Sequence, residues 1–502
     1  MKKSKLIILL ATMLLLVSFT AGCSSKEDGQ QNVTSNGGNT KEEKKELETL
    51  TILYPGEESE RMTEFLDNEF AEKMKEDLGL KVEMVFVPWA QYWEQKDIML
   101  AAQEPIDLYW DGLPDLSTMV NKKQARELDD LIAQYGQDML KVLPQSQLDG
   151  ATINGKIYGI PTAYAPSSGM FQLVCVRQDI LEAVGMTDLN TADDLKEFAT
   201  RVKEQFPEMK GPADVIIKPL TRNFAEEQYN FIAAQEMVVF GEESHKAYNY
   251  YATEAFQEVA KFNRSMYEAG LYTEDLTIKY NERDSRMQTG LYLWVEGFLG
   301  KDMEIIDTVK ANAPDARLKT YLLKEEEPRY ITSAGGEVLC IPNTAPNPEG
   351  AMKFLNWLYT SQENYLFALY GVEGKDYEIV DGRINKISAN DFFYEWMFRN
   401  QNYQLFGPEV EQEYIDSYLA WDDEALTSKS MGFRFNNENV KDIETRIAEV
   451  AGKDLLSIQC GFVDFETEYP KAMEKLKAAG MDEYVAEVQR QLDEFLASKE
   501  VK

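Results

Sequence analysis

Apolar positions recur at two spacings along the chain, and together they predict alternating strands and helices. Residues 50–54 form a strand-like run that ends at a Pro-Gly pair. Apolar residues then recur at helical spacing over 62–74 until Gly79, and residues 82–86 alternate as a second strand. A third strand-like run follows at 106–110. This order predicts a βαβ unit and an α/β domain with a mainly parallel sheet.

A hairpin signal stands at Asn154-Gly155, between Ile153 and Ile157. Both turn residues accept the positive φ of a type I′ turn, so a strand is expected on either side. Pro161 lacks a backbone donor, which predicts that the chain leaves its sheet near Ile160 as an edge segment. The next strand-like run, 170–176, is followed by a helix-rich region, as if a second lobe begins there.

Further elements are predicted along the remaining chain. A short helix ends at Gly185, and Thr191 opens another helix in the manner of a capping box. Residues 223–275 are expected to be rich in helix, and 291–295 to form a strand. Strands at 330–332 and 337–341 precede an amphipathic helix that begins near Asn347, and an apolar stripe predicts a packed helix at the C-terminus.

Acidic residues dominate the charge of the 502-residue chain. It has 87 Asp and Glu against 52 Lys and Arg, a formal net charge of −35. This field repels nucleic-acid phosphates, so we expect no nucleic-acid partner. We interpret the excess as a solvated surface rather than a cation site.

The first 23 residues have the features of a bacterial export signal. A basic start precedes the apolar run 6–17, and small residues lead to Cys23. Thr20-Ala21-Gly22-Cys23 resembles the lipobox of bacterial lipoproteins, which implies cleavage after residue 22, lipidation of Cys23 and attachment to the outer face of the cytoplasmic membrane. Residues 23–48 are polar and predict a disordered tether.

The other three cysteines and the single histidine give no reactive centre. Cys175, Cys340 and Cys460 are far apart in sequence, so we read them as buried thiols rather than as disulfides or a zinc motif. His245 stands in a polar stretch and is expected at the surface. We therefore expect no metal, no cofactor and no catalytic pair.

Several segments together resemble the cluster-1 extracellular solute-binding proteins of ABC importers. They are the hairpin stretch 154–164, the block from Gly335-Gly336 through Pro342 into a helix ending at 358–360, and the segments 369–377, 432–435 and 480–492. The last three resemble lipoprotein-type members from Gram-positive bacteria. The resemblance implies an α/β, two-lobed periplasmic-binding-protein-like (type II) fold with an interlobe cleft and a helical C-terminal extension. It places lobe 1 at 49–164 plus 320–370, and lobe 2 at 165–319 plus 371–502 with the C-terminal helical region.

The resemblance also implies a function without catalysis, in which an oligosaccharide is captured and passed to ABC permease subunits by a monomeric receptor. Aromatic rings match the apolar faces of sugars, and carboxylates suit their hydroxyls. Loops after strands of a parallel sheet line ligand crevices. The expected ligand-binding residues are Trp89, Tyr92, Trp110, Asp111, Tyr164, Trp294, Glu296 and Trp396.

Two alternatives remain open at this point. A surface glycoside hydrolase would also be acidic and aromatic-rich, but it needs a pair of carboxylates across the scissile bond, and the sequence singles out no such pair. A binding protein for peptides or another small polar solute is the other alternative.

Overall fold

A five-stranded sheet organises the first lobe of the computed structural model, which describes residues 47–500 except 144, 163–166, 170, 234–235, 273–279, 333–335 and 388–391. Its strands lie in the order β2 (Leu80–Val87), β1 (Glu48–Pro55), β3 (Leu108–Gly112), β14 (Glu337–Cys340) and β6 (Ile160–Pro161). β1 pairs in parallel with β2 and with β3, which confirms the predicted βαβ unit and third strand. β14 is antiparallel to β3 and β6, and β6 lies at the edge, where Pro161 costs no ladder bond.

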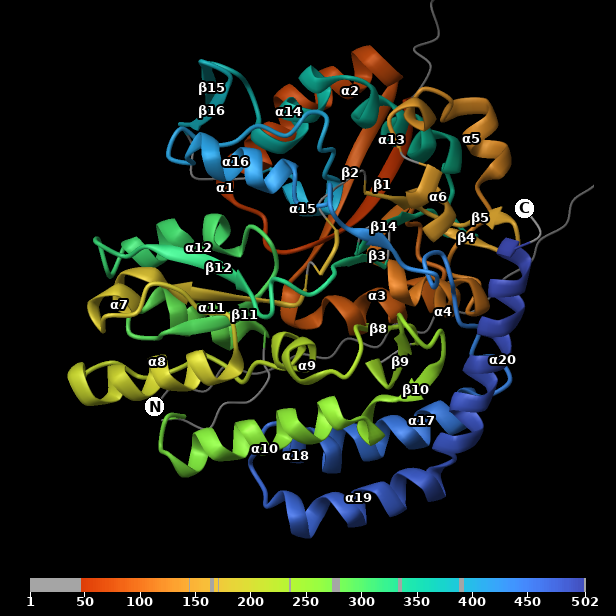
Figure 1. Ribbon diagram of the computed structural model, residues 1–502. Coiled ribbons are helices and arrows are strands. Elements are labelled where there is room, and N and C mark those ends of the chain that lie inside the picture. The colour runs from red at the N-terminus through yellow and green to blue at the C-terminus, as the bar shows by residue number, and fades with distance from the viewer. Residues whose placement is uncertain are drawn as a thin grey trace, which may run out of the picture. The chain divides into compact units, whose positions relative to one another are not determined.

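Helices cover this sheet, and the connection from β1 to β2 includes a π-helical turn at Leu66–Phe70 (Figure 1). The helices are α1 (Glu60–Phe65), α2 (Ala71–Leu78), α3 (Tyr92–Ala101), α4 (Leu116–Asn121), α5 (Asp129–Tyr135), α6 (Gln145–Gly150), α13 (Pro348–Thr360), α14 (Gln362–Tyr370) and α15 (Glu395–Phe398). The helix predicted to begin near Asn347 is α13, and Asn347 caps it, because its side chain accepts a hydrogen bond from the Gly350 N–H at 2.9 Å.

The Asn154-Gly155 signal produces the predicted hairpin. β4 (Thr152–Ile153) and β5 (Lys156–Ile157) pair in antiparallel register, with φ of 51° at Asn154 and 77° at Gly155. A second hairpin joins β15 (Tyr377–Val380) and β16 (Arg383–Lys386).

The second lobe is built on a three-stranded antiparallel sheet in the order β11 (Trp294–Gly297), β7 (Leu173–Arg177) and β12 (Leu318–Leu322). Its helices are α7 (Gln178–Ala183), α8 (Ala192–Gln205), α9 (Lys218–Phe224), α11 (Tyr280–Gln288) and α12 (Lys301–Lys310). The capping box predicted at Thr191 is confirmed: Thr191 Oγ1 accepts from the Asp194 N–H, and the Asp194 carboxylate accepts from the Thr191 N–H.

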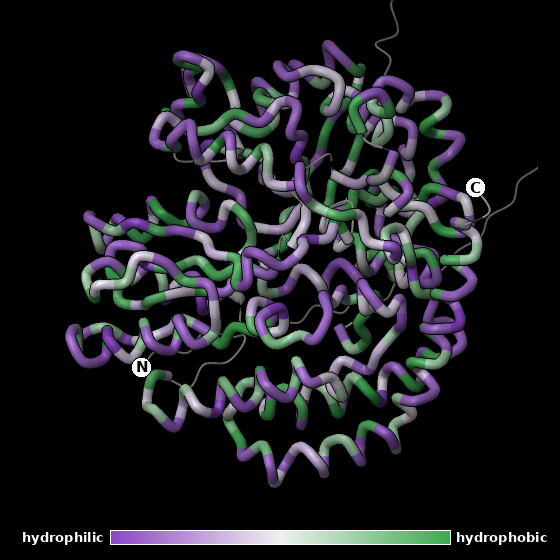
Figure 2. The backbone as a smooth tube through the Cα atoms, in the orientation of Figure 1, coloured by the Kyte–Doolittle hydropathy of each residue, from purple (hydrophilic) through white to green (hydrophobic). Residues whose placement is uncertain are grey.

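The C-terminal region shares a hydrophobic core with another antiparallel sheet, of β10 (Ala247–Asn249), β9 (Val238–Gly241) and β8 (Tyr229–Phe231). The helices around it are α10 (Glu254–Glu268), α17 (Lys441–Val450), α18 (Leu456–Gln459), α19 (Phe465–Ala479) and α20 (Met481–Glu500). Along α10 and α19, hydrophobic and hydrophilic stretches alternate (Figure 2). The apolar stripe of the last helix is packed in this core, as predicted. The expectation that 223–275 is rich in helix was wrong for 229–249, where β-branched and aromatic residues form strands.

The packing of core residues differs from the expected lobe boundaries in two places. Tyr321 and Leu323 pack in the core of the second lobe, although the first lobe was expected to resume at 320. Tyr377, Ile384 and Phe398 pack in the core of the first lobe, although residues from 371 onward were assigned to the second. The chain therefore returns to the first lobe at β14 and stays with it through α15.

A short C-terminal segment contacts both places where the chain crosses between the lobes. After α16 (Gln412–Leu419), Asp422 accepts hydrogen bonds from Ser167 and Ser168. Further on, β17 (Leu426–Thr427) pairs in parallel with β13 (Tyr330–Ile331). We call residues 421–428 the clasp.

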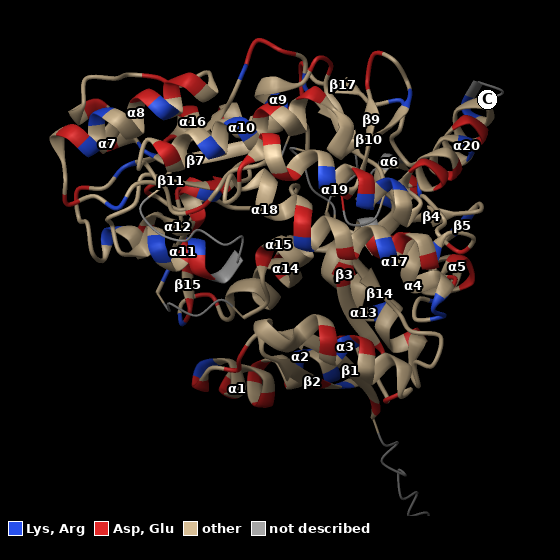
Figure 3. Ribbon diagram, turned by 90° about the horizontal axis from the view of Figure 1, so that it is seen from below, with Lys and Arg blue, Asp and Glu red and all other residues tan. Residues whose placement is uncertain are grey.

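Other features of the chain agree with the sequence where the structure describes them. Cys175, Cys340 and Cys460 are buried and free, and His245 is exposed. Acidic residues are spread over many elements rather than gathered in one patch (Figure 3). No helix in the described part of the chain is long and apolar enough to cross a membrane. The predicted signal, Cys23 and the tether up to residue 46 lie outside the described residues.

Candidate functional site

Six aromatic residues meet on the first lobe, and we call them the aromatic cluster. They are Trp89, Tyr92, Trp93, Trp110, Tyr394 and Trp396. The Trp89 ring centroid lies 5.9 Å from that of Trp110 and 5.8 Å from that of Trp396. Tyr394 and Trp396 are stacked with an interplanar angle of 16°. The structure thus brings together four of the predicted residues, Trp89, Tyr92, Trp110 and Trp396, from segments about 300 positions apart in sequence.

Members of the aromatic cluster differ in how much ring surface they offer to a ligand. Tyr92 is buried, and its hydroxyl donates to the Trp110 carbonyl at 2.7 Å. Trp89 is 36% exposed and Trp93 is 48% exposed. Two indole rings therefore present open area above a packed aromatic base, which is an arrangement suited to stacking on an apolar ligand face.

A buried ion pair lies beneath these rings. Lys96 Nζ lies 4.8 Å from the centroid of the Trp93 ring and forms a salt bridge with the Asp111 carboxylate. The other Asp111 oxygen accepts from the Gly112 N–H at 2.7 Å. Burial raises the pKa of Asp111 to about 6, against the opposing effect of Lys96. Asp111 was predicted to bind ligand, but it is 1% exposed and engaged in this pair, so it supports the cluster from below.

The remaining predicted residues do not join the aromatic cluster. Trp294 has no exposed area and packs in the core of the second lobe, which leaves its ring no face for a ligand in this structure. Glu296 accepts hydrogen bonds from the backbone N–H groups of Ile217 (2.5 Å) and Lys218 (3.1 Å), at the start of α9. Its carboxylate therefore has a local structural role, and burial raises its pKa. Tyr164 lies outside the described residues.

A cavity of about 220 Å³ lies between the lobes. The first lobe contributes Leu113, Ser117 and Thr118 to its wall, and the segment before β7 contributes Phe171. Most of the polar lining comes from the second lobe and the C-terminal region: Lys218, Thr221, Arg222, Gln228, Asn230, Glu236, Glu242, Ser430, Arg434 and Asn437. None of the predicted ligand-binding residues that the structure describes lines this cavity.

Two of the basic residues in the cavity wall are already engaged. Lys218 forms a salt bridge with Glu236 at 2.6 Å. Arg222 donates to the side chain of Gln228 and to four backbone carbonyls, and burial lowers its pKa to about 10. Lys218 was not predicted, because both basic residues lie on the short helix α9, and nothing in the sequence shows that its polar side chains face a cavity. The described residues also contain no group of three acidic, Cys or His side chains placed to hold a metal ion.

Comparison with protein families gives two matches. The model of the bacterial extracellular solute-binding protein family matches residues 69–371, which is more than half of the chain. A domain of unknown function matches residues 429–497, which include α17 to α19 and most of α20.

Individual proteins agree with the family match. A protein of Streptococcus pneumoniae serotype 4 described as a carbohydrate ABC transporter substrate-binding protein is 24% identical over 97% of this chain and 98% of its own length. The lipoprotein LipO of Bacillus subtilis is 21% identical over 78% of this chain and 76% of its own.

Among solved structures, the N-glycan transport solute binding protein NgtS of Streptococcus pneumoniae matches with a TM-score of 0.75 at 23% identity. The match covers 90% of this chain and 100% of NgtS. NgtS in complex with Man5GlcNAc matches with a TM-score of 0.70, also at 23% identity, over 90% of this chain and 99% of that one. These likenesses show that the chain has the two-lobed α/β fold that its sequence implied.

Proposed function

We propose that this chain, which belongs to the bacterial extracellular solute-binding proteins, captures an oligosaccharide between its lobes and delivers it to an ABC permease. The observation that carries the sugar assignment is the aromatic cluster. Trp89 and Trp93 offer open indole area on a base of packed rings, and pyranose C–H faces stack on such area. The similarity to a carbohydrate-transport protein along nearly the whole chain supports the same assignment.

The proposed mechanism is closure of one lobe on the other without catalysis. A ligand that contacts both lobes favours the closed state by the difference between its affinities for the two states. The chain would act as a monomer, held to the outer face of the membrane by a lipid on Cys23. The tether would raise its effective concentration near the permease.

A binding screen tests this function directly. The mature chain without its lipid is mixed separately with maltohexaose, mannohexaose, xylohexaose, N-acetylchitohexaose and a mixture of short peptides, and unfolding is followed on heating. A sugar at 100 times its dissociation constant adds about 2.7 kcal/mol of stability. Each sugar is then recovered and analysed by mass spectrometry. Stabilisation with intact sugar supports the proposal, whereas cleavage points to a hydrolase and stabilisation by peptides alone points to a peptide receptor.

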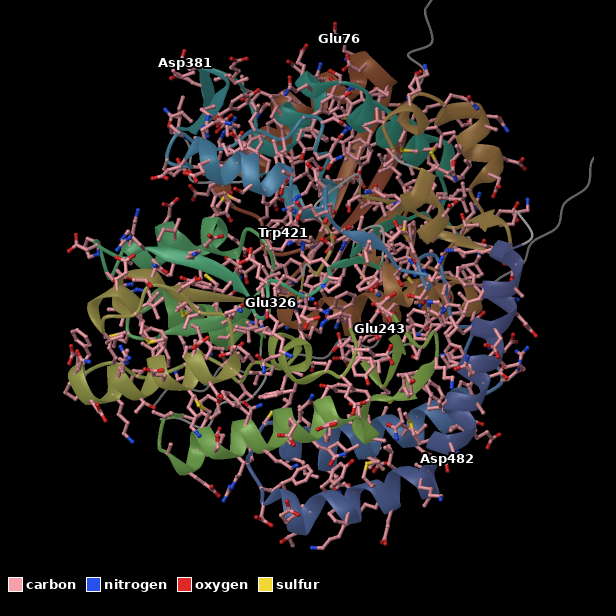
Figure 4. The ribbon with its side chains drawn as sticks, viewed as in Figure 1. Glu76, Glu243, Glu326, Asp381, Trp421 and Asp482 are labelled. Atoms are coloured by element: carbon pink, nitrogen blue, oxygen red, sulfur yellow. The ribbon has the colours of Figure 1, made fainter. Side chains whose placement is uncertain are left out.

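Variants of the aromatic cluster connect the binding to its site. Trp93→Ala and Trp89→Ala should each weaken sugar affinity about fivefold, because a lost stacking partner contributes on the order of 1 kcal/mol. Val380→Ala is the control, since Val380 is 52% exposed and stands beside the β15–β16 turn residue Asp381, at the upper edge of Figure 4. Equal affinity in all three variants would contradict the assignment of the aromatic cluster.

A further inference from the structure

Two charged side chains in the wall of the interlobe cavity have unmet hydrogen-bonding capacity. Glu242 follows directly after β9 and is 5% exposed. Arg434 reaches the cavity from the segment between the clasp and α17. Both line the cavity, and each has buried polar atoms without a well-formed hydrogen bond to any described residue.

A series of hydrogen-bonding side chains leads to Glu242. The Asn230 amide donates to Ser430 Oγ at 2.9 Å, and Ser430 Oγ lies 2.8 Å from Ser428 Oγ. Since Ser430 already accepts from Asn230, its own proton can point to Ser428, whose proton is then free for Glu242. The Ser428 hydroxyl acts on Glu242 in the direction that favours its charged form, but burial prevails and raises the pKa of Glu242 to about 7. A carboxylate has room for about four hydrogen bonds, so most of its accepting capacity remains unused.

No basic group compensates this carboxylate among the described residues that act on its titration. Glu227 raises its pKa further, and Glu243 is the adjacent acidic side chain. Tyr330 on β13 faces the same group, because Glu242 raises the pKa of that phenol. The described groups that act on the titration of Glu242 are thus acidic or neutral, and the Ser428 hydroxyl is the one donor among them, so the carboxylate keeps accepting capacity for a donor on the ligand.

Arg434 complements Glu242 in hydrogen-bonding character. Its Nε donates to the Gly150 carbonyl at 2.8 Å and its Nη1 to the Phe433 carbonyl at 2.8 Å, but its Nη2 has no acceptor among the described residues. Burial is the cause that lowers its pKa to about 10. Arg222 nearby shows the contrast, because oxygens of the protein satisfy it throughout.

We propose that Glu242 is a specificity-determining residue of the cavity, whose carboxylate accepts a hydrogen bond from a hydroxyl or amine of the bound sugar while Arg434 Nη2 donates to an oxygen of that sugar. This inference rests on the proposed function and identifies the side chain in the cavity wall that accepts the ligand's donor. An ionised acceptor forms the stronger hydrogen bond, so binding weakens as pH falls through the range in which Glu242 gains its proton.

The test measures dissociation constants by calorimetry at pH 8 and pH 6 for the four hexaoses named above and for chitohexaose. Because chitohexaose carries amines, its comparison with the other sugars shows whether the donor to Glu242 is a hydroxyl or an amine. Wild-type affinity should fall about tenfold from pH 8 to pH 6. Glu242→Gln should bind about tenfold more weakly at pH 8 and show no dependence on pH. Glu243→Gln removes the same charge one position away on an exposed side chain, labelled in Figure 4, and should follow the wild type.

Arg434→Lys separates the two proposed roles. It keeps the charge and loses Nη2, so affinity should drop at both pH values while the dependence on pH remains. Circular dichroism confirms that each variant is folded. The inference is overturned if Glu242→Gln keeps the wild-type pH profile, or if both variants bind as the wild type does. A wild-type chain that binds none of these sugars overturns the proposed function, and this inference with it.

Discussion

The clasp gives the sharpest prediction about stability, at Asp422. Its carboxylate accepts four hydrogen bonds from a segment about 250 positions earlier in the chain. They come from the N–H (2.7 Å) and Oγ (3.2 Å) of Ser167, and from the N–H (2.9 Å) and Oγ (2.5 Å) of Ser168. The adjacent Trp421, labelled near the middle of Figure 4, donates its indole N–H to the Ser168 carbonyl at 2.8 Å. Replacing Asp422 by Asn removes the charge and turns one accepting oxygen into a donor.

The size of the effect follows from the number and kind of these bonds. A hydrogen bond to a charged group contributes about 1.5–3 kcal/mol, and the substitution disrupts two of the four at least. Because Asp422 is only half-buried, water offsets part of the loss. We therefore expect Asp422→Asn to lower the free energy of unfolding by about 3 kcal/mol.

Asp423 provides a matched control, because it is the adjacent aspartate and is exposed. Asp423→Asn should change the free energy of unfolding by no more than about 0.5 kcal/mol. Both variants are unfolded in urea and compared at their midpoints. Equal destabilisation by the two substitutions, or none by either, would refute the reasoning.

Three further predictions concern the interior. Lys96→Met leaves Asp111 buried without its partner and should destabilise by about 3–5 kcal/mol in urea, with part of the loss recovered when Asp111→Asn is added. Gly461→Ala should lower the free energy of unfolding by more than about 2 kcal/mol in the same assay, because the new Cβ would lie 2.4 Å from backbone atoms of α10. Gly155 has a similar φ and open space around the position of a Cβ, so Gly155→Ala measures the backbone strain alone. Burial raises the pKa of Glu337 to about 7. The contribution of this group to stability is therefore fully present below its unfolded pKa and is lost as pH rises through 7. The melting temperature should fall from pH 5 to pH 8, and it should fall less steeply in Glu337→Gln.

Elements with a local physical cause were predictable from the sequence. The hairpin turn at Asn154-Gly155 depends on two residues that accept positive φ, and the cap at Asn347 depends on one side chain reaching an N–H three positions away. Trp89 and Trp110 were both predicted as site residues because the runs 82–86 and 106–110 indicated neighbouring strands of one parallel sheet, whose carboxyl ends share an edge; in the structure Trp89 follows β2 and Trp110 lies within β3. The family resemblance supplied the two-lobed arrangement that connects these pieces.

Features that depend on distant partners were not predictable in this way. Asp111 was predicted to bind ligand because nothing in the sequence shows that Lys96, on α3, forms a salt bridge with it. The strands at 229–249 are short, and the tyrosines around them also occur in helices, so only the pairing of the strands with one another decides that this region is a sheet. Glu242 has no sequence signal, because its significance comes from the burial and the cavity around it.

The two lobes offer different chemistry to a ligand, and this difference suggests which of the proposed binding steps comes first. Open indole area stands on the first lobe at Trp89 and Trp93, where a sugar can stack before the lobes close. Most of the polar lining of the cavity, including Glu242 and Arg434, belongs to the second lobe and the C-terminal region. Stacking tolerates many sugars, whereas hydrogen bonds from a buried wall reject a ligand that leaves them unpaired. Capture on the first lobe would therefore be permissive, and closure would carry the selection.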